Sequence, residues 1–199
     1  MVRSPFVPPH LYGLYEIEDW RNGLAIMNSV HPESWREITT VLSSFRLKRS
    51  QIVEPGRNKS PIAKHLDDEL RRFDWKEKRF DVSWVIDDEE HNVLTHGIDC
   101  YKDRVALEVE WNNKDPFFDR DLLNFSHLFQ LGAIDVGVIL TRSSRLQEIF
   151  DELGKGKSYG NSTTHMSKLI PRVEAGGGGG CPLIAFGIRK EAYEDDLGT

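Results

Sequence analysis

The strongest constraint on the fold is a continuous apolar run of strand length, Ile134 to Leu140. It follows a segment that opens at Asp115-Pro116, stops at Gly132, and carries apolar residues at helical spacing: Phe118, Leu122, Phe125 and Phe129. The stretch before that helix, Val105 to Trp111, has the alternation of a strand. Because a helical crossover joins parallel strands, we expect these two strands to lie parallel and buried in one sheet.

Other segments extend this sheet. Strand-forming stretches run from Phe80 to Ile86, from Val93 to Tyr101 (expected antiparallel to its successor) and from Leu183 to Ile188. Helical patterns lie near Glu16 to Ser29, Pro32 to Phe45, Ser60 to Phe73, Ser144 to Leu153 and from about Thr163, with a turn at Glu54-Pro55-Gly56. The sequence therefore predicts an α/β (α+β) fold with a mixed central sheet of five-stranded type, flanked by helices.

Length and composition indicate one soluble domain. The 199 residues fit a single globular unit, 1–199, with an N-terminal helical part at about 1–58 and a core at about 60–190. A hydrophobic content of 39% and a charged content of 29% exclude wholesale disorder. No run of about 18 apolar residues and no signal peptide are present, so we expect a cytoplasmic protein without membrane contact. Cys100 and Cys181 lack zinc-site spacing and are expected to be buried thiols.

Charge is segregated along the chain, although the net charge is −6. Between Arg46 and Arg79 there are eleven basic residues against six acidic ones, whereas the next segment is acidic, with four consecutive acids from Asp87 to Glu90. A basic segment suits a phosphate-bearing partner. Two solvated faces of opposite sign explain the same pattern, so charge alone does not decide the function.

The chemistry is concentrated on the strand that precedes the crossover. Its alternation places Val105, Leu107, Val109 and Trp111 on one face, and Ala106, Glu108 and Glu110 on the other. The two carboxylates would stand roughly 6 to 7 Å apart at the backbone, and a divalent cation would compensate their repulsion. By itself, however, such alternation is more typical of the solvent face of a half-buried sheet.

A third acid joins this face if the preceding hairpin has the right register. A two-residue turn at Lys102-Asp103 pairs Asp99 with Ala106 and places Asp99 diagonal to Glu108, whereas a loop of odd length would shift the register. Three hard oxygen ligands without thiols favour Mg²⁺, with Mn²⁺ able to substitute. Such an ion generates a hydroxide nucleophile, which indicates phosphodiester hydrolysis.

These residues resemble a known pattern. Asp99, eight intervening residues and then Glu108-Val109-Glu110, between an upstream helix carrying Glu69 and a downstream helix and strand, are similar to the PD-(D/E)XK nuclease core. More narrowly, roughly Ser60 to Ile188 resembles type II restriction endonucleases of the BglII/BamHI group and implies a restriction-endonuclease-like fold. The last motif position, commonly lysine in the superfamily, is Glu110 here, as in BamHI-like enzymes; BglII-like enzymes have glutamine.

The resemblance also implies roles for individual residues. Asp99 and Glu108 would bind the metal, with the Val109 carbonyl as a further ligand, and Glu110 would orient or deprotonate the attacking water. Glu69 would support the site from its helix, or it is a surface residue of the acidic run Asp67-Asp68-Glu69.

Two polar segments are candidates for reading bases. Asparagine, arginine and lysine recognise base edges in the major groove, which points to Asn112, Asn113 and Lys114. The second segment is Asn161, Ser162, Thr163, Thr164 and His165. Its asparagine and serine match positions that contact bases in BglII-like enzymes, although either could equally be an ordinary helix cap. Phosphate contacts are expected from the basic residues Arg57, Lys59, Lys155, Lys157 and Lys168.

The resemblance implies a type II site-specific deoxyribonuclease that cuts double-stranded DNA. Its sites would be six-base palindromes centred on GATC and cut to leave four-base 5′ overhangs, which requires a homodimer because one domain reads one half-site. A cognate DNA methyltransferase is expected in the host, though not as a stable partner. The alternatives are a catalytically inactive, sequence-specific DNA-binding protein with the same fold and, more remotely, a glycoside hydrolase.

Overall fold

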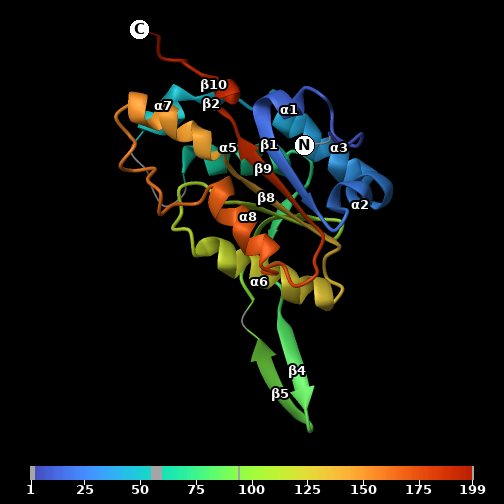
Figure 1. Cartoon of the computed structure of the whole chain (residues 1–199). Helices are drawn as coiled ribbons and strands as arrows, with labels where there is room; N and C mark the ends of the chain where they lie inside the picture. The colour runs from blue at the N-terminus through green and yellow to red at the C-terminus, as the bar shows by residue number, and fades with distance from the viewer. Residues whose placement is uncertain (1–2, 55–59, 94, 199) are drawn as a thin grey trace.

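A six-stranded mixed sheet forms the centre of the computed structural model, which describes residues 3–54, 60–93 and 95–198 (Figure 1). Its strand order is β1-β9-β8-β7-β6-β3. The strands are β1 (Tyr15–Trp20), β3 (Lys76–Lys78), β6 (Ile98–Lys102), β7 (Val105–Val109), β8 (Val136–Arg142) and β9 (Leu183–Ile188). Strands β7, β8 and β9 are parallel, and β6, β3 and β1 run antiparallel to their neighbours. The expected mixed sheet is confirmed, with one strand more than anticipated.

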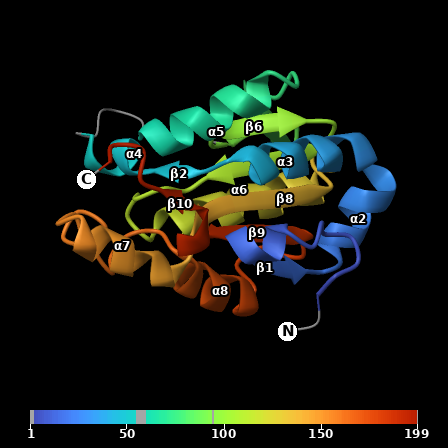
Figure 2. The ribbon, with the colours of Figure 1, turned by 90° about the horizontal axis from the view of Figure 1, so that it is seen from above.

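Helices cover both faces of the sheet (Figures 1 and 2). They are α1 (Leu11–Leu14), α2 (Gly23–Val30), α3 (Pro32–Ser44), α4 (Arg49–Val53), α5 (Pro61–Arg71), α6 (Phe117–Gln130), α7 (Gln147–Glu152) and α8 (Met166–Glu174), with 3₁₀ turns at Ser144–Leu146 and Lys190–Ala192. One hydrophobic core lies between the N-terminal helices, helix α7 and the face of the sheet that carries Leu107 and Phe186. A second core lies between helices α6 and α8 and the opposite face, which carries Ala106 and Ala185.

The predicted crossover is confirmed. Strand β7 leads through α6 into β8, and the two strands pair in parallel from Val105–Val136 onward. Phe118, Leu122 and Phe125 are buried against the sheet, because their spacing places them on one side of α6. A Cβ on Gly137 would lie 2.6 Å from the Phe125 ring, so the glycine lets α6 pack close to β8.

Several sequence expectations are confirmed in detail. Strand β9 has the predicted limits, α3 and α5 match their predicted segments, and the Ser60 side chain caps α5 by accepting a hydrogen bond from Ala63 N at 3.1 Å. Both cysteines are buried thiols. In the part of the chain that the structure describes, no helix is long and apolar enough to cross a membrane.

The helix expected from Glu16 to Ser29 is wrong in its first part. Residues Tyr15–Trp20 form β1, which pairs antiparallel with β9, and helix α2 begins only at Gly23. Alternating burial in β1, with Tyr15 and Ile17 inside, shows the period of a strand. The N-terminal part at about 1–58 is therefore not purely helical, because it contributes an edge of the sheet.

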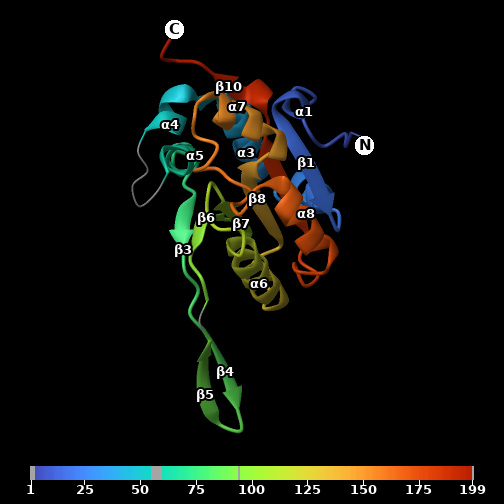
Figure 3. The same ribbon diagram turned by 60° about the vertical axis from the view of Figure 1, so that its left-hand side comes forward.

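The strand limits expected between Phe80 and Tyr101 also need correction. Strands β4 (Val82–Ile86) and β5 (Glu89–Val93) form a separate hairpin that projects from the domain beyond α6 (Figure 3), and β6 begins only at Ile98. The turn between β4 and β5 consists of Asp87 and Asp88, both with positive φ. A short parallel pair, β2 (Leu47–Lys48) with β10 (Tyr193–Glu194), lies apart from the main sheet.

Candidate active site

The β6–β7 hairpin brings Asp99 and Glu108 together. Its turn is Asp103-Arg104, both residues having positive φ, and not Lys102-Asp103 as expected. The register is therefore displaced by two residues: Cys100 pairs with Leu107, and one step further Asp99 stands opposite Glu108 instead of Ala106. A two-residue shift preserves the face of every side chain, so Asp99 still joins the carboxylate face, and more closely than expected.

Reciprocal hydrogen bonds lock these two acids across the strands. Glu108 Oε2 accepts from the Asp99 amide at 3.3 Å, and Asp99 Oδ2 accepts from the Val109 amide at 3.1 Å. Glu108 is only 2% exposed, and its Oε1 atom has no hydrogen-bond partner among the described residues. A buried carboxylate oxygen without a partner is costly, which makes this atom a ready ligand for a cation.

A cavity of about 240 Å³ opens over this pair. It is lined by Ser60, Ala63, His96, Asp99, Glu108, Val109, Glu110, Trp111, Asn113 and Arg120. Within the described residues, no three Asp, Glu, His or Cys side chains form a complete metal-ligand cluster. Two carboxylates with a backbone carbonyl and room for water nevertheless fit Mg²⁺, which keeps several waters and uses few protein ligands.

Glu110 belongs to a second cluster, which includes an acid that the sequence analysis missed. Asp121, on α6, is fully buried, and its charge acts on the Glu110 carboxyl. Arg120 donates to Asp121 Oδ1 at 2.8 and 2.9 Å and lies 3.4 Å from Glu110 Oε1. Asn113 Nδ2 donates to Glu110 Oε2 at 2.8 Å. Glu110 is therefore held from three directions beside the metal-ligand pair.

Burial and mutual repulsion keep protons in this cluster. Burial raises the pKa of Glu108 well above its ordinary value, and the charges of Asp121 and Asp99 raise it further. Burial, followed by the charge of Asp121, raises the pKa of Glu110 to about 8. Burial also raises the pKa of Asp121, and Arg120 partly offsets this. Glu110 therefore holds a proton at neutral pH in the metal-free protein.

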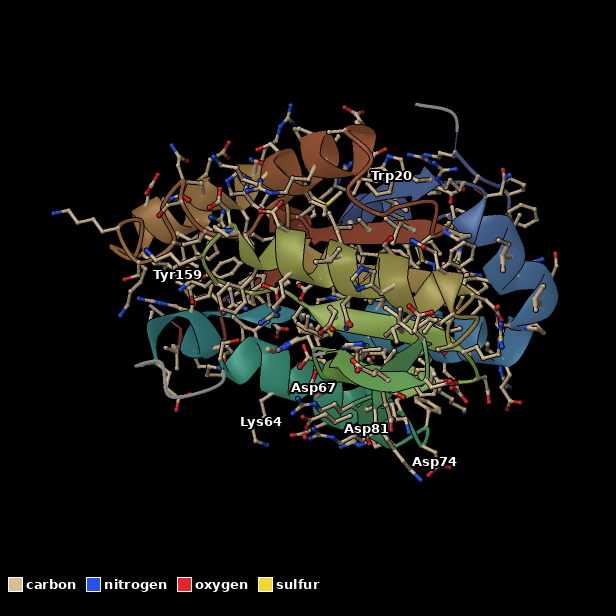
Figure 4. All side chains as sticks on the ribbon, turned by 90° about the horizontal axis from the view of Figure 1, so that it is seen from below. Trp20, Lys64, Asp67, Asp74, Asp81 and Tyr159 are labelled. Carbon is tan, nitrogen blue, oxygen red and sulfur yellow. The ribbon has the colours of Figure 1, made fainter. Side chains whose placement is uncertain are left out.

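The expected catalytic role of Glu69 is not supported by its position. Glu69 forms an ion pair at 2.9 Å with Arg72, the residue that follows the helix, and is not among the described residues that line the cavity. Only the start of α5 reaches the cavity, through Ser60 and Ala63. Further along the helix, Asp67 is buried against Cys100, on the opposite face of β6 from Asp99, and Lys64 points outward (Figure 4).

The two candidate base-reading segments lie side by side. Lys114 and Thr163 form an antiparallel bridge, and flanking backbone bonds run from Thr164 N to Asn113 O and from Asp115 N to Ser162 O. Among their side chains, Lys114, Asn161 and Ser162 are exposed and Asn112 is half-buried. Thr163, Thr164 and His165 are buried, so in this conformation their side chains are placed to shape the segment instead of touching bases.

The basic residues proposed for phosphate contact differ in their surroundings. Lys157 is exposed and Lys155 half-buried, whereas Lys168 lies 3.7 Å from the Asp115 carboxylate. Arg57, Lys59 and most of the expected turn at Glu54-Pro55-Gly56 lie outside the described residues.

A comparison with protein families identifies the family of the chain. The sequence profile described as restriction endonuclease BglII/BglIII matches residues 15–188, which is most of the chain. The chain belongs to this family. No curated protein sequence gives a significant match. The resemblance drawn from Asp99 and Glu108-Val109-Glu110 is confirmed at the level of the family, and with it the restriction-endonuclease-like fold.

Membership defines the general activity of this restriction endonuclease. It is a site-specific nuclease that acts on double-stranded DNA, and enzymes of this kind generally use a divalent metal ion. Sequence reasoning found Asp99, Glu108 and Glu110 but missed Asp121, Arg120 and His96. One signal for Asp121 was available: it lies three residues after Phe118 and four before Phe125, which places an acid within the apolar stripe of α6.

Proposed function

We propose that this endonuclease is a magnesium-dependent type II enzyme that cuts palindromic DNA with the Asp99–Glu108 pair. The observation that carries the proposal is the buried Oε1 atom of Glu108, which has no hydrogen-bond partner among the residues that the structure describes. Hydrogen bonds join this glutamate to Asp99 at the floor of an open cavity. Asp99, Glu108 and the Val109 carbonyl would hold the ion. When bound, it polarises the scissile phosphate and lowers the pKa of a coordinated water; Mn²⁺ would serve in its place.

The remaining residues orient the attack. Glu110, fixed by Asn113 and lying beside Asp121, is positioned to orient the attacking water and, once metal binding has displaced its own proton, to accept a proton from that water. Arg120, 34% exposed at the cavity, supplies the positive charge that a phosphate and its transition state require. Substrate contacts outside the cavity would come from Asn112, Lys114, Asn161 and Ser162.

We further propose that residues 1–199 work as one domain and that two copies form a homodimer. The two cores share a single sheet, which supports one cooperative unit. One copy presents one set of catalytic acids, so cutting both strands of a symmetric site requires two copies related by a two-fold axis. The family resemblance supports a site centred on GATC and four-base 5′ overhangs; it leaves the outer base pairs open.

Plasmid cleavage tests this function. Unmethylated plasmid is incubated with the protein and Mg²⁺, with and without a chelator, and the cut ends are sequenced. Discrete, chelator-sensitive fragments with four-base 5′ ends around GATC are expected. A plasmid that stays intact across divalent metals and salt, while duplex DNA is still bound, would instead establish the binding-only alternative. Sedimentation of the DNA complex measures the dimer.

A further inference from the structure

Thr164 links the base-reading segments directly to Glu110. Its side chain is fully buried, and its hydroxyl donates to the Glu110 carbonyl at 3.2 Å. Its amide donates to Asn113 O at 2.9 Å, and Asn113 in turn donates its side-chain amide to the Glu110 carboxylate. One residue of the second segment therefore bonds to the end of the catalytic strand and to the residue that holds the Glu110 side chain.

A buried arginine, Arg142, holds the second candidate segment at Thr163 and at the loop that precedes it. Arg142, at the end of β8, is 1% exposed, and its guanidinium donates to the Tyr159 carbonyl at 2.9 Å and to Thr163 Oγ1 at 3.0 Å. It also lies over the Phe150 ring at 5.4 Å, and no ion pair joins it to an acid of the described residues. Burying an arginine without a counter-charge is costly, and an apolar residue would fill a core position at lower cost. Its hydrogen bonds to the 159–163 loop account for its presence.

We propose that Thr164 and Arg142 are positioning residues that join residues 112–114 and 161–165 into one recognition unit and couple it to Glu110. This inference rests on the proposed function. The unit is attached to the sheet at Glu110 and at Arg142. Strands β7 and β8 are paired in parallel, and Glu110 N donates to Leu140 O at 2.9 Å, so these two residues lie at the ends of one hydrogen-bonded pair of strands. Correct base contacts would hold the unit in place and thereby keep Glu110 aligned with the attacking water. A wrong base pair would displace the unit, and Glu110 with it.

Thr164→Val tests the coupling because it removes the hydroxyl and keeps the shape. Cutting rates are measured on the cognate site and on sites with one base pair changed, together with DNA affinity in the absence of metal. We expect the cognate rate to fall about tenfold, the rates on altered sites to change less than about twofold, and the affinity to stay the same. Discrimination between sites therefore falls by about the same factor. Thr164→Ser, which retains the hydroxyl, should restore the cutting rate on the cognate site and the discrimination between sites.

Thr141→Val is the matched control. Thr141 is also fully buried, one residue before Arg142, and its hydroxyl has no hydrogen-bond partner among the described residues. This variant should cut with wild-type rate and discrimination. The coupling is refuted if Thr164→Val lowers the cutting rates on the cognate site and on the altered sites by the same factor. It is also refuted if Thr164→Val leaves both rates unchanged, as Thr141→Val should.

Arg142→Lys provides a second arm if Thr164→Val does not fold. Lysine keeps the charge but lacks the planar fork that reaches several oxygens at once, so discrimination should fall by at least as much. Unchanged discrimination in a folded Arg142→Lys protein would also refute the coupling. A wild-type protein that cuts no DNA contradicts the proposed function itself, whereas wild-type cutting with normal discrimination in both variants contradicts only this inference.

Discussion

Two glutamates of this restriction endonuclease are buried to a similar extent, but their surroundings differ. Glu37 of α3 is 5% exposed and accepts hydrogen bonds from Lys102 Nζ at 2.7 Å and Trp75 Nε1 at 2.8 Å, one at each oxygen. Glu108, on β7, is 2% exposed, and one of its oxygens has no hydrogen-bond partner in the described part of the chain. Its neighbours include the acids Asp99 and Asp121. The negative charge of Glu37 is therefore compensated within the fold, whereas that of Glu108 needs a ligand to compensate it.

The largest expected effect is on catalysis at Glu108. Glu108→Gln should lower the cutting rate by roughly 10³-fold or more, because the amide is a poor ligand for a divalent cation. DNA affinity without metal should be retained or increased, since a negative charge near the phosphates is removed. Single-turnover cutting and fluorescence anisotropy measure the two quantities. A variant that cuts at the wild-type rate would show that the metal is held elsewhere.

Glu37 should show the opposite pattern. Glu37→Gln leaves the Lys102 ammonium, 20% exposed, without its counter-charge, and should lower the free energy of unfolding by about 3 kcal/mol. Cutting by the folded protein should not change. Urea unfolding and a cutting assay well below the melting temperature test this. Loss of cutting at undiminished stability would mean that Glu37 acts on the site, and the contrast with Glu108 would fail.

Stability of the metal-free protein should decrease as the pH rises. The pKa of Glu110 is raised to about 8, so the folded state holds a proton that the unfolded chain releases near the ordinary glutamate value of 4.5. The resulting stabilisation is complete below pH 4.5 and is lost as the pH approaches 8. Between pH 6 and 8.5 the loss should be about 2 to 3 kcal/mol in the free energy of unfolding.

Magnesium should reverse this trend, because it binds the deprotonated carboxylates. Thermal unfolding at several pH values, with and without Mg²⁺, measures both effects. The largest gain from Mg²⁺ is expected at the highest pH. If the metal-free protein is more stable at pH 8.5 than at pH 6, the cluster does not hold its protons as described.

The smallest effect is expected at Glu110 itself. Glu110→Gln places there the residue that the resemblance assigns to BglII-like enzymes, and the amide oxygen still accepts the hydrogen bond from Asn113. Cutting should fall by only about tenfold, corresponding to one lost interaction in the transition state. The rate should also become less dependent on pH near 8. A loss as large as that of Glu108→Gln would make Glu110 a direct metal ligand.

Local patterns predicted the central part of the molecule, and non-local pairing limited the rest. The β7–α6–β8 crossover followed from an apolar run and a helical stripe, both contained in a short stretch of sequence. Strand β1 was missed because its partner, β9, lies far along the chain, at residues 183–188. The pair Asp103-Arg104 lacks the glycine that commonly marks a two-residue hairpin turn, so its positive φ values, and with them the register of Asp99, could not be inferred.

The place of β9 in the sheet has a consequence for how the protein is made. This strand, Leu183–Ile188, lies between β1 and β8, so the first and last segments of the sheet meet there. Such pairing requires closure of a very long loop, which slows folding. Until residue 188 has left the ribosome, β1 and β8 lack their shared neighbour and the sheet that supports the carboxylates is incomplete. We therefore expect DNA cutting to begin only after residues 183–188 have been synthesised and paired.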